Sequence, residues 1–155
     1  MKIRIHHFFD MVRDFGSGKT FLPHPYQHAY HLVAKEIWSN PHVHLNLVVA
    51  SDAVCFGCLH QKNSSCDDII THRKDFTSKE AFNNYLDKRI MKVCGIQNSD
   101  AYTPEELCRF AGKYLENIFF IYEGNDEEHT RERKKNVMKG LSLYAQKHRL
   151  TSYDG

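Results

Sequence analysis

Two short segments near the N-terminus decide the fold: KIRIH at residues 2–6 and VHLNLVVA at residues 43–50. The first alternates polar and apolar residues, which is typical of a strand with one buried face. The second is rich in β-branched residues and leucine and ends as a continuous apolar run, which indicates a strand buried on both faces. The apolar spacing over residues 25–39 predicts a helix between them, and Asn40 and Pro41 end that helix.

Strand, helix and strand in this order form a βαβ unit, in which the two strands are almost always parallel. The carboxyl ends of parallel strands lie at one edge of the sheet, where open α/β sheets place their ligands. The first strand brings His6 and His7 to this edge, and the second brings the loop that begins at Ser51. We therefore expect these two histidines to lie beside the cysteines of that loop.

The rest of the chain is predicted to be mainly helical. Residues 67–76 are expected to form a short helix, and residues 78–94 a longer helix that begins at a capping serine and ends before Gly95. The sequence TPEE at residues 103–106 is a typical helix start, and apolar residues follow it at helical spacing up to Ile118. One more amphipathic helix follows a charged stretch.

The predicted class is α/β, with α+β as the alternative. We expect a small sheet with a βαβ unit near the N-terminus, followed by a mainly helical C-terminal half. The 155 residues match the usual size of one domain, so residues 1–155 are taken as a single domain. Within it, residues 123–155 are expected to form a peripheral C-terminal helix.

Charge and hydropathy exclude several classes of protein. The 21 Lys and Arg residues against 19 Asp and Glu give a formal net charge of +2, spread along the chain, so nothing favours a nucleic-acid partner. The longest apolar runs fall well short of the roughly 20 residues that cross a bilayer, so no membrane partner is expected. His6, His7 and Asp10 interrupt the place where the apolar core of a signal peptide would lie. We therefore expect a cytoplasmic protein.

The five cysteines include a cluster with the spacing C-x2-C-x7-C, formed by Cys55, Cys58 and Cys66. Two thiolates separated by a short turn that contains glycine can chelate one ion, and a Cys3His set is a known zinc arrangement. The strand geometry favours His7 as the fourth ligand, with His6 second, while His60 inside the loop is the local competitor. The preferred cofactor is a zinc ion, and an iron–sulfur cluster is the alternative.

Two other readings of the cluster stay open. The three cysteines can be reduced surface residues without a metal. They can also form a dithiol redox centre, but the residues after Cys58 resemble a loop, whereas a thioredoxin-type thiolate needs a helix N-terminus to lower its pKa.

His24, His28 and His31 would share one face of a helix that begins near residue 24. His pairs at this spacing can bind metal, but no acidic residue follows in the His-Glu-x-x-His pattern, so a solvated polar face is favoured. If that helix points its N-terminus at the sheet edge, His28 and His31 would line the pocket there.

The chain also resembles a known family, in its HHFF sequence at residues 6–9, its DAVCFGC loop at residues 52–58 with Cys66 downstream, and LDKRI at residues 86–90. These motifs are similar to those of the domain-of-unknown-function 1284 family of small bacterial and archaeal proteins, over residues 1–110. The resemblance implies a metal or cluster site at His6, His7, Cys55, Cys58 and Cys66, and no particular reaction. Members typically have a cysteine where this chain has Asp10, a departure that favours a harder ion such as zinc.

Three hypotheses about function follow. The first is a mainly structural zinc site that fixes the cysteine loop. The second is an enzyme with an open metal or cluster that acts on a small molecule, with His6 or Asp52 as the proton carrier. The third is a protein-interaction module without metal, in which the amphipathic C-terminal helix forms a homodimer.

Overall fold

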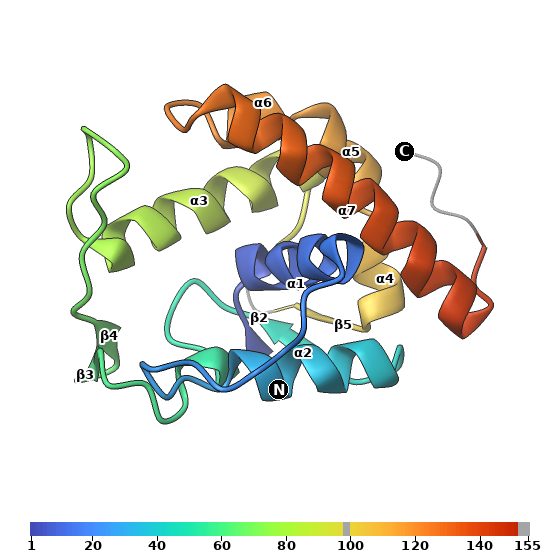
Figure 1. Cartoon of the computed structure of the whole chain (residues 1–155), viewed down its shortest axis with the longest axis horizontal. Coiled ribbons are helices and arrows are strands. Elements are labelled where there is room, and N and C mark those ends of the chain that lie inside the picture. The colour runs from blue at the N-terminus through green and yellow to red at the C-terminus, as the bar shows by residue number, and fades with distance from the viewer. Residues whose placement is uncertain (98–99, 152–155) are drawn as a thin grey trace.

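The computed structural model describes residues 1–97 and 100–151 of the chain. Figure 1 shows a small sheet surrounded by helices. The elements in chain order are β1 (Lys2–Ile3), α1 (Ile5–Ser17), α2 (Tyr30–Ser39), β2 (Leu45–Leu47), the 3-10 helix η1 (Ala53–Cys55), β3 (Gln61–Lys62), β4 (Ser65–Cys66), α3 (Lys79–Cys94), β5 (Ala101–Tyr102), α4 (Pro104–Cys108), α5 (Ala111–Glu116), α6 (Ile118–Ile121) and α7 (Glu127–His148).

The main sheet is small and mixed, with the strand order β1-β2-β5. Strand β1 pairs with β2 in parallel, with Lys2 opposite Asn46, and β5 pairs with β2 in antiparallel orientation. The parallel first pair, the small sheet and the mainly helical C-terminal half are confirmed, and the class is α+β. Strands β1 and β2 are both shorter than their sequence patterns predict. Within β2, only Leu45 and Leu47 of the second segment point into the core.

The helix α1 is absent from the sequence prediction, which extends the first strand to residue 6. Its buried residues include Ile5, Phe8, Val12 and Phe15, a spacing that gives a helix one apolar face. The first strand therefore ends at Ile3, and Ile5 belongs to the helix that follows. His6 and His7 lie in the first turn of this helix and not at the end of a strand.

The helices α1 and α7 cross at two glycines, Gly16 and Gly140. A Cβ atom on Gly16 would lie 1.8 Å from the carbonyl oxygen of Asn136, and one on Gly140 would lie 1.9 Å from that of Val12. Only glycine permits this backbone approach. Helix α7, expected at the periphery, therefore packs closely against α1 and places apolar side chains in the core, including Val137, Leu141 and Tyr144.

Helix boundaries agree with the sequence where capping residues mark them. Ser78 accepts a hydrogen bond from the amide of Ala81, and Gly95 ends α3 in the left-handed conformation. Thr103 and Glu106 form a complete capping box at the start of α4. The predicted helix that follows is divided into α4, α5 and α6.

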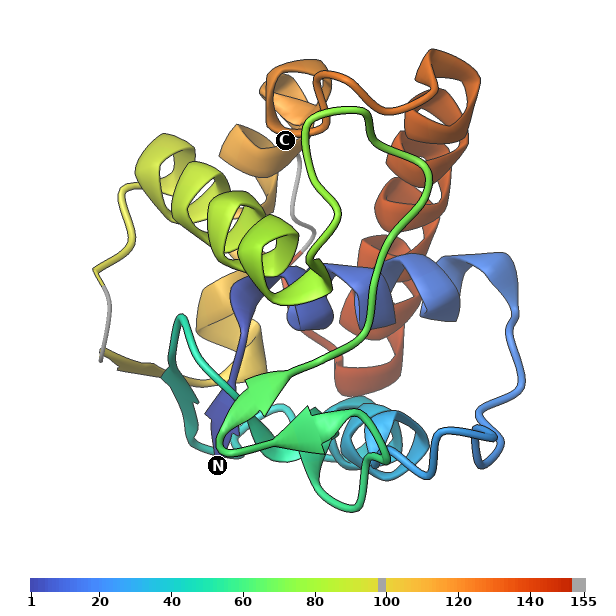
Figure 2. The ribbon, with the colours of Figure 1, turned by 90° about the vertical axis from the view of Figure 1, so that its left-hand side faces the viewer.

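Two predicted helices are wrong in extent. Helix α2 begins at Tyr30 and not at residue 25, so His24 and His28 lie in the loop before it and share no helical face with His31. Residues 67–76 form a loop in which Ile69 makes a bridge with Ser78. This loop, green in Figure 2, runs from the β3–β4 hairpin toward the turn before α7, where Arg73 donates a hydrogen bond to Asn125.

Within residues 1–97 and 100–151, no helix combines the length and the apolar character that a membrane crossing requires.

Candidate functional site

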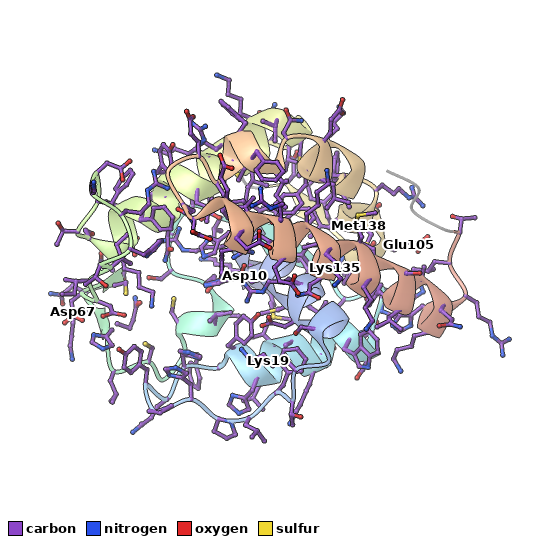
Figure 3. All side chains as sticks on the ribbon, turned by 45° about the horizontal axis from the view of Figure 1, so that its top comes forward. Asp10, Lys19, Asp67, Glu105, Lys135 and Met138 are labelled. Atoms are coloured by element: carbon purple, nitrogen blue, oxygen red, sulfur yellow. The ribbon has the colours of Figure 1, made fainter. Side chains whose placement is uncertain are left out.

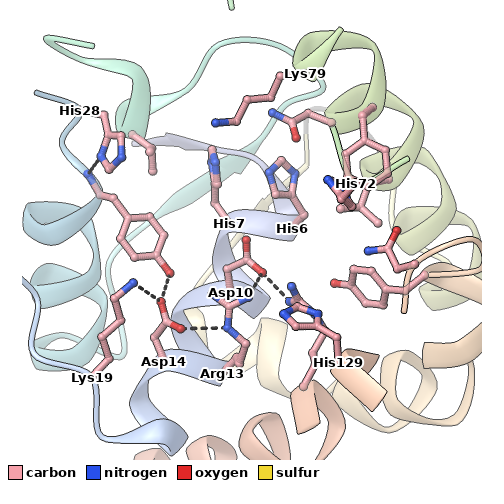
Figure 4. Close-up of a pocket in the computed structure, with 18 of the residues that line it drawn as sticks. His6, His7, Asp10, Arg13, Asp14, Lys19, His28, His72, Lys79 and His129 are labelled. Atoms are coloured by element: carbon pink, nitrogen blue, oxygen red, sulfur yellow. Dashed lines mark hydrogen bonds and ion pairs between the residues drawn. The ribbon is translucent and has the colours of Figure 1, made fainter. Parts of the chain in front are cut away.

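A cavity of about 880 Å³ opens between α1, the loop before α2, the start of α3 and the start of α7. Figure 4 shows the polar side chains that surround it. They include His6, His7, Asp10 and Arg13 from α1, His28 from the loop before α2, and Lys79 from the start of α3. A helix that the sequence pattern did not predict thus supplies five polar residues of the wall, because the helical turn places residues 6, 7, 10, 13 and 14 near one another.

Two histidine–aspartate pairs stand side by side at the cavity wall. His6 Nδ1 lies 2.7 Å from an oxygen of Asp87, and His7 Nδ1 lies 2.8 Å from an oxygen of Asp52. The centroids of the two imidazole rings are 4.2 Å apart. Because a carboxylate accepts hydrogen bonds only, each Nδ1 is the donor, and each ring turns its Nε2 away from its partner.

Buried hydrogen bonds fix both carboxylates. Asp52 caps η1 by accepting from the amide of Val54, and it also accepts from the amide of Arg4 at 2.7 Å. Asp87 accepts from the guanidinium of Arg4 at 2.7 Å and from the amide of His6 at 3.1 Å. Arg4 therefore contributes to both pairs. A histidine whose Nδ1 is held in this way has a set ring orientation and a set tautomer.

The electrostatics of the His7–Asp52 pair favour its ionised form. Burial alone would lower the pKa of His7, but the charge and hydrogen bond of Asp52, together with the charges of Asp10 and Asp87, outweigh burial and raise that pKa above its ordinary value. Burial would likewise raise the pKa of Asp52, but His7 and the amide of Arg4 lower it to about 2. At neutral pH Asp52 is therefore a carboxylate, and it favours the protonated form of His7.

The cavity floor is a network of ion pairs. Asp10 interacts with Arg133 and Arg13, and Asp14 accepts from Arg13 at 2.9 Å and from the hydroxyl of Tyr30 at 2.7 Å. Although burial opposes ionisation, the charge of Arg133 holds the pKa of Asp10 well below its usual range. These carboxylates already have cationic partners, so they fix the shape of the floor.

The cysteine loop borders this site through Asp52. Cys55 Sγ lies 3.6 Å from one oxygen of Asp52, and His7 binds the other oxygen. The expected proximity of His7 to the first cysteine of the loop is therefore observed. Cys66 lies on β4, and Cys58 lies in the turn before β3.

The other predicted ligands are engaged elsewhere. His60 Nδ1 pairs with Asp67 at 2.8 Å, in a partly exposed position on the β3–β4 hairpin. Burial raises the pKa of the Cys55 thiol to about 11 and also raises that of Cys66. In the part of the chain that the structure describes, no three His, Cys, Asp or Glu side chains converge as metal ligands. The thiols of Cys55 and Cys66 therefore ionise less readily than an ordinary cysteine.

The sequence predicts His6, His7 and Asp52 as residues of this edge but not Asp87 and Arg4. The alternation of residues 2–6 places Arg4 on the exposed face of the expected strand, whereas in the structure Arg4 is buried and paired with acidic side chains.

Comparison with known proteins finds no match to the chain among protein-family models, curated proteins or solved structures. The family resemblance of the short motifs therefore stays a prediction, and function is argued from the geometry of the cavity.

Proposed function

We propose that the protein is an enzyme that acts on a small molecule in the cavity by general acid–base catalysis at His6 and His7. One observation carries the proposal: two adjacent imidazoles, each held through Nδ1 on a buried carboxylate, at the wall of one cavity. General acid–base catalysis requires a positioned group that can give and accept a proton near neutral pH, and histidine meets this requirement most often.

The tautomer supports a catalytic role over a purely structural one. With the proton on Nδ1 and hydrogen-bonded to the carboxylate, the neutral ring carries its lone pair on Nε2. Neither Nε2 has a protein partner among residues 1–97 and 100–151. His7 is a proton donor in its imidazolium form, and its Nε2 becomes a base once the proton has left. Asp52 stabilises the imidazolium and stays ionised throughout.

The experiment that tests this proposal is an activity screen with chromogenic carboxyl and phosphate esters, followed by substitutions. His7→Gln and Asp52→Asn should each lower kcat at least 100-fold, within the range that general acid–base catalysis supplies. The control is Asp67→Asn, which removes the carboxylate of the partly exposed His60–Asp67 pair. Figure 3 shows Asp67 well away from Asp10 of the cavity. An activity that survives His7→Gln unchanged would refute the catalytic role of this pair.

A second proposal concerns the cysteine loop as a metal site, with a zinc ion preferred and an iron–sulfur cluster as the alternative. Its support is that Cys55 and His7 share the carboxylate of Asp52, and that Cys58 lies near enough to Cys66 to contribute to its raised pKa. As the side chains stand they do not fit one ion, because Cys55 would have to leave Asp52 before it could bind. A bound ion would fix the loop, since metal-binding free energy is then folding free energy.

Metal analysis and an ultraviolet–visible spectrum of anaerobically purified protein test this second proposal. About one zinc per chain that Cys58→Ser removes and Cys94→Ser retains would support it; Cys94 is a buried cysteine of α3. Brown colour with iron and sulfide would favour the cluster. Protein that contains neither metal and keeps its melting temperature in Cys58→Ser would exclude a metal at the loop.

We also propose a cytoplasmic location and a homodimer as the alternative to a monomer. Five free cysteines are typical of a reducing compartment. Sedimentation of the full chain measures the mass of the particle in solution. The mass of a single chain would exclude the homodimer.

A further inference from the structure

Three side chains form a separate part of the cavity wall next to His7: His24, His28 and Lys79. The rings of His24 and His28 stack with their centroids 4.4 Å apart, in the loop before α2. Lys79 is the first residue of α3, and Figure 4 shows its ammonium end directed toward the space between His28 and His7. We call these three residues the donor wall.

The histidines of the donor wall have the opposite tautomer to His6 and His7. The amide of Tyr26 donates to His24 Nδ1 at 3.0 Å, and the amide of Tyr30 donates to His28 Nδ1 at 3.4 Å. A ring nitrogen that accepts a hydrogen bond carries no proton, so the proton of the neutral ring lies on Nε2. Each of these two histidines can therefore donate a hydrogen bond through Nε2.

His28 keeps this state near neutral pH. Burial lowers the pKa of His28, and the nearby charges of His24, His7 and Lys79 lower it further. Its ring is therefore mostly neutral at pH 7, with one N–H group available at Nε2.

Lys79 adds a positive charge and two more donors. Its ammonium donates one hydrogen bond to Asp68 at 3.0 Å. An ammonium group has three N–H bonds, so two remain for another acceptor. The acidic residues Asp10 and Asp14 lie with their own arginine and lysine partners on the floor, at the other side of His7 in Figure 4.

We propose that the donor wall binds an anionic oxygen group of the substrate, a phosphate or a carboxylate, and so places the substrate against His7. The inference rests on the proposed function, because it assumes that the substrate occupies this cavity. Its physical basis is that His24, His28 and Lys79 together offer N–H donors and a positive charge on one side of His7, while Asp10 and Asp14 of the floor are already paired with cationic side chains. Oxyanions are the groups that such a set of donors recognises.

Calorimetric titration of the full chain with inorganic phosphate and with malonate tests the proposal. His28→Ala removes the donor and should weaken binding about tenfold, the loss of one hydrogen bond to a charged group. His28→Gln restores an N–H group at the same distance from the backbone and should keep binding within about twofold. Lys79→Met should also weaken binding about tenfold. The control is His42→Ala, an exposed histidine that does not line the cavity.

The two probes identify the source of the anionic group. Binding of phosphate alone supports a phosphate-bearing substrate, and binding of malonate supports a carboxylate. Absence of binding for both probes, or equal affinity of His28→Ala and the unaltered chain, would overturn the proposal. If binding of the anion depends on His28 but catalysis does not depend on His7, the proposal for the donor wall is retained and the proposed function is rejected. Lys79→Met decides the matter if a His28 variant does not fold.

Discussion

Arg4 and Asp87 form an ion pair at 2.7 Å, and both side chains are almost completely excluded from solvent. The guanidinium of Arg4 also reaches Glu80 at 2.9 Å, and the backbone amide of Arg4 donates to Asp52. One residue therefore fixes the carboxylates on which both His6 and His7 depend. The ion pair connects the start of α1 to the middle of α3, so the fold and the site share this contact.

Replacing Arg4 tests this connection. Arg4→Met would leave Asp87 buried without its cationic partner, which should lower the free energy of unfolding by about 3–5 kcal/mol. Arg131→Met is the control, because Arg131 makes its ion pairs on the surface of α7, where such pairs contribute less than about 1 kcal/mol. Chemical unfolding measures both variants. Equal losses in the two variants would show that the buried Arg4–Asp87 pair contributes no more to the free energy of unfolding than a surface pair does.

A second prediction concerns the tuning of His7 by Asp52. In Asp52→Asn the burial of His7 remains while the largest charge that raises its pKa is gone, so the pKa of His7 should fall; the charges of Asp10 and Asp87 still act to raise it. Titration followed by nitrogen-15 NMR of the imidazole measures this change. Asp67→Asn should leave the titration of His7 unaltered. A pKa of His7 that is the same in Asp52→Asn as in the unaltered chain would show that Asp52 is not its cause.

The sequence predicts those parts of the fold that depend on local signals. The parallel strand pair follows from two apolar segments, and the ends of α3 and the start of α4 follow from capping residues. Helix α1 escaped prediction because Ile3 and Ile5 alternate as a strand does, and the tertiary contact of Gly16 with α7 determines where the helix packs. The amphipathic pattern of residues 123–155 indicates an apolar face, but not that this face crosses α1 at Gly140.

The candidate site was only partly predictable for a related reason. The sequence predicts that His6 and His7 lie near the loop that contains Asp52, because β1 and β2 are parallel, although both histidines lie in the first turn of α1 and not at the end of β1. It does not reveal that Asp87 and Arg4 meet there, because Arg4 and Asp87 are 83 positions apart and their contact depends on how α3 packs. The tautomers of His24 and His28 depend on single backbone amides of a loop, which sequence spacing cannot specify.

The crossing of α1 and α7 supplies a third prediction. Gly140→Ala places a Cβ against the carbonyl of Val12, so the two helices must separate, and the free energy of unfolding should fall by about 3 kcal/mol. Lys139→Ala, at an exposed position of the same helix, should change it by less than about 0.5 kcal/mol. Thermal unfolding compares the two variants. A stabilised Gly140→Ala would show that helix propensity outweighs the close approach.

The fourth prediction is a window of pH in which the His7–Asp52 pair stabilises the fold. The pKa of His7 is raised in the folded chain, so its contribution is complete below the ordinary value of 6.5 and is lost as the pH rises through the folded value. The pKa of Asp52 is lowered from 3.8 to about 2, so its contribution is complete above 3.8 and is lost as the pH falls through 2. The pair should therefore stabilise the fold most between these limits.

Urea unfolding of the unaltered chain and of His7→Gln measures this window. The difference in free energy of unfolding should be greatest at about pH 5, where His7 is protonated and Asp52 is ionised, and should shrink as the pH rises above 6.5 and through the folded pKa of His7. The matched control is His60→Gln, since the His60–Asp67 pair is partly exposed and contributes less than about 1 kcal/mol at any pH. A difference for His7→Gln that is independent of pH would mean that the ring stabilises the fold by packing, and that the charge of Asp52 has no part in it.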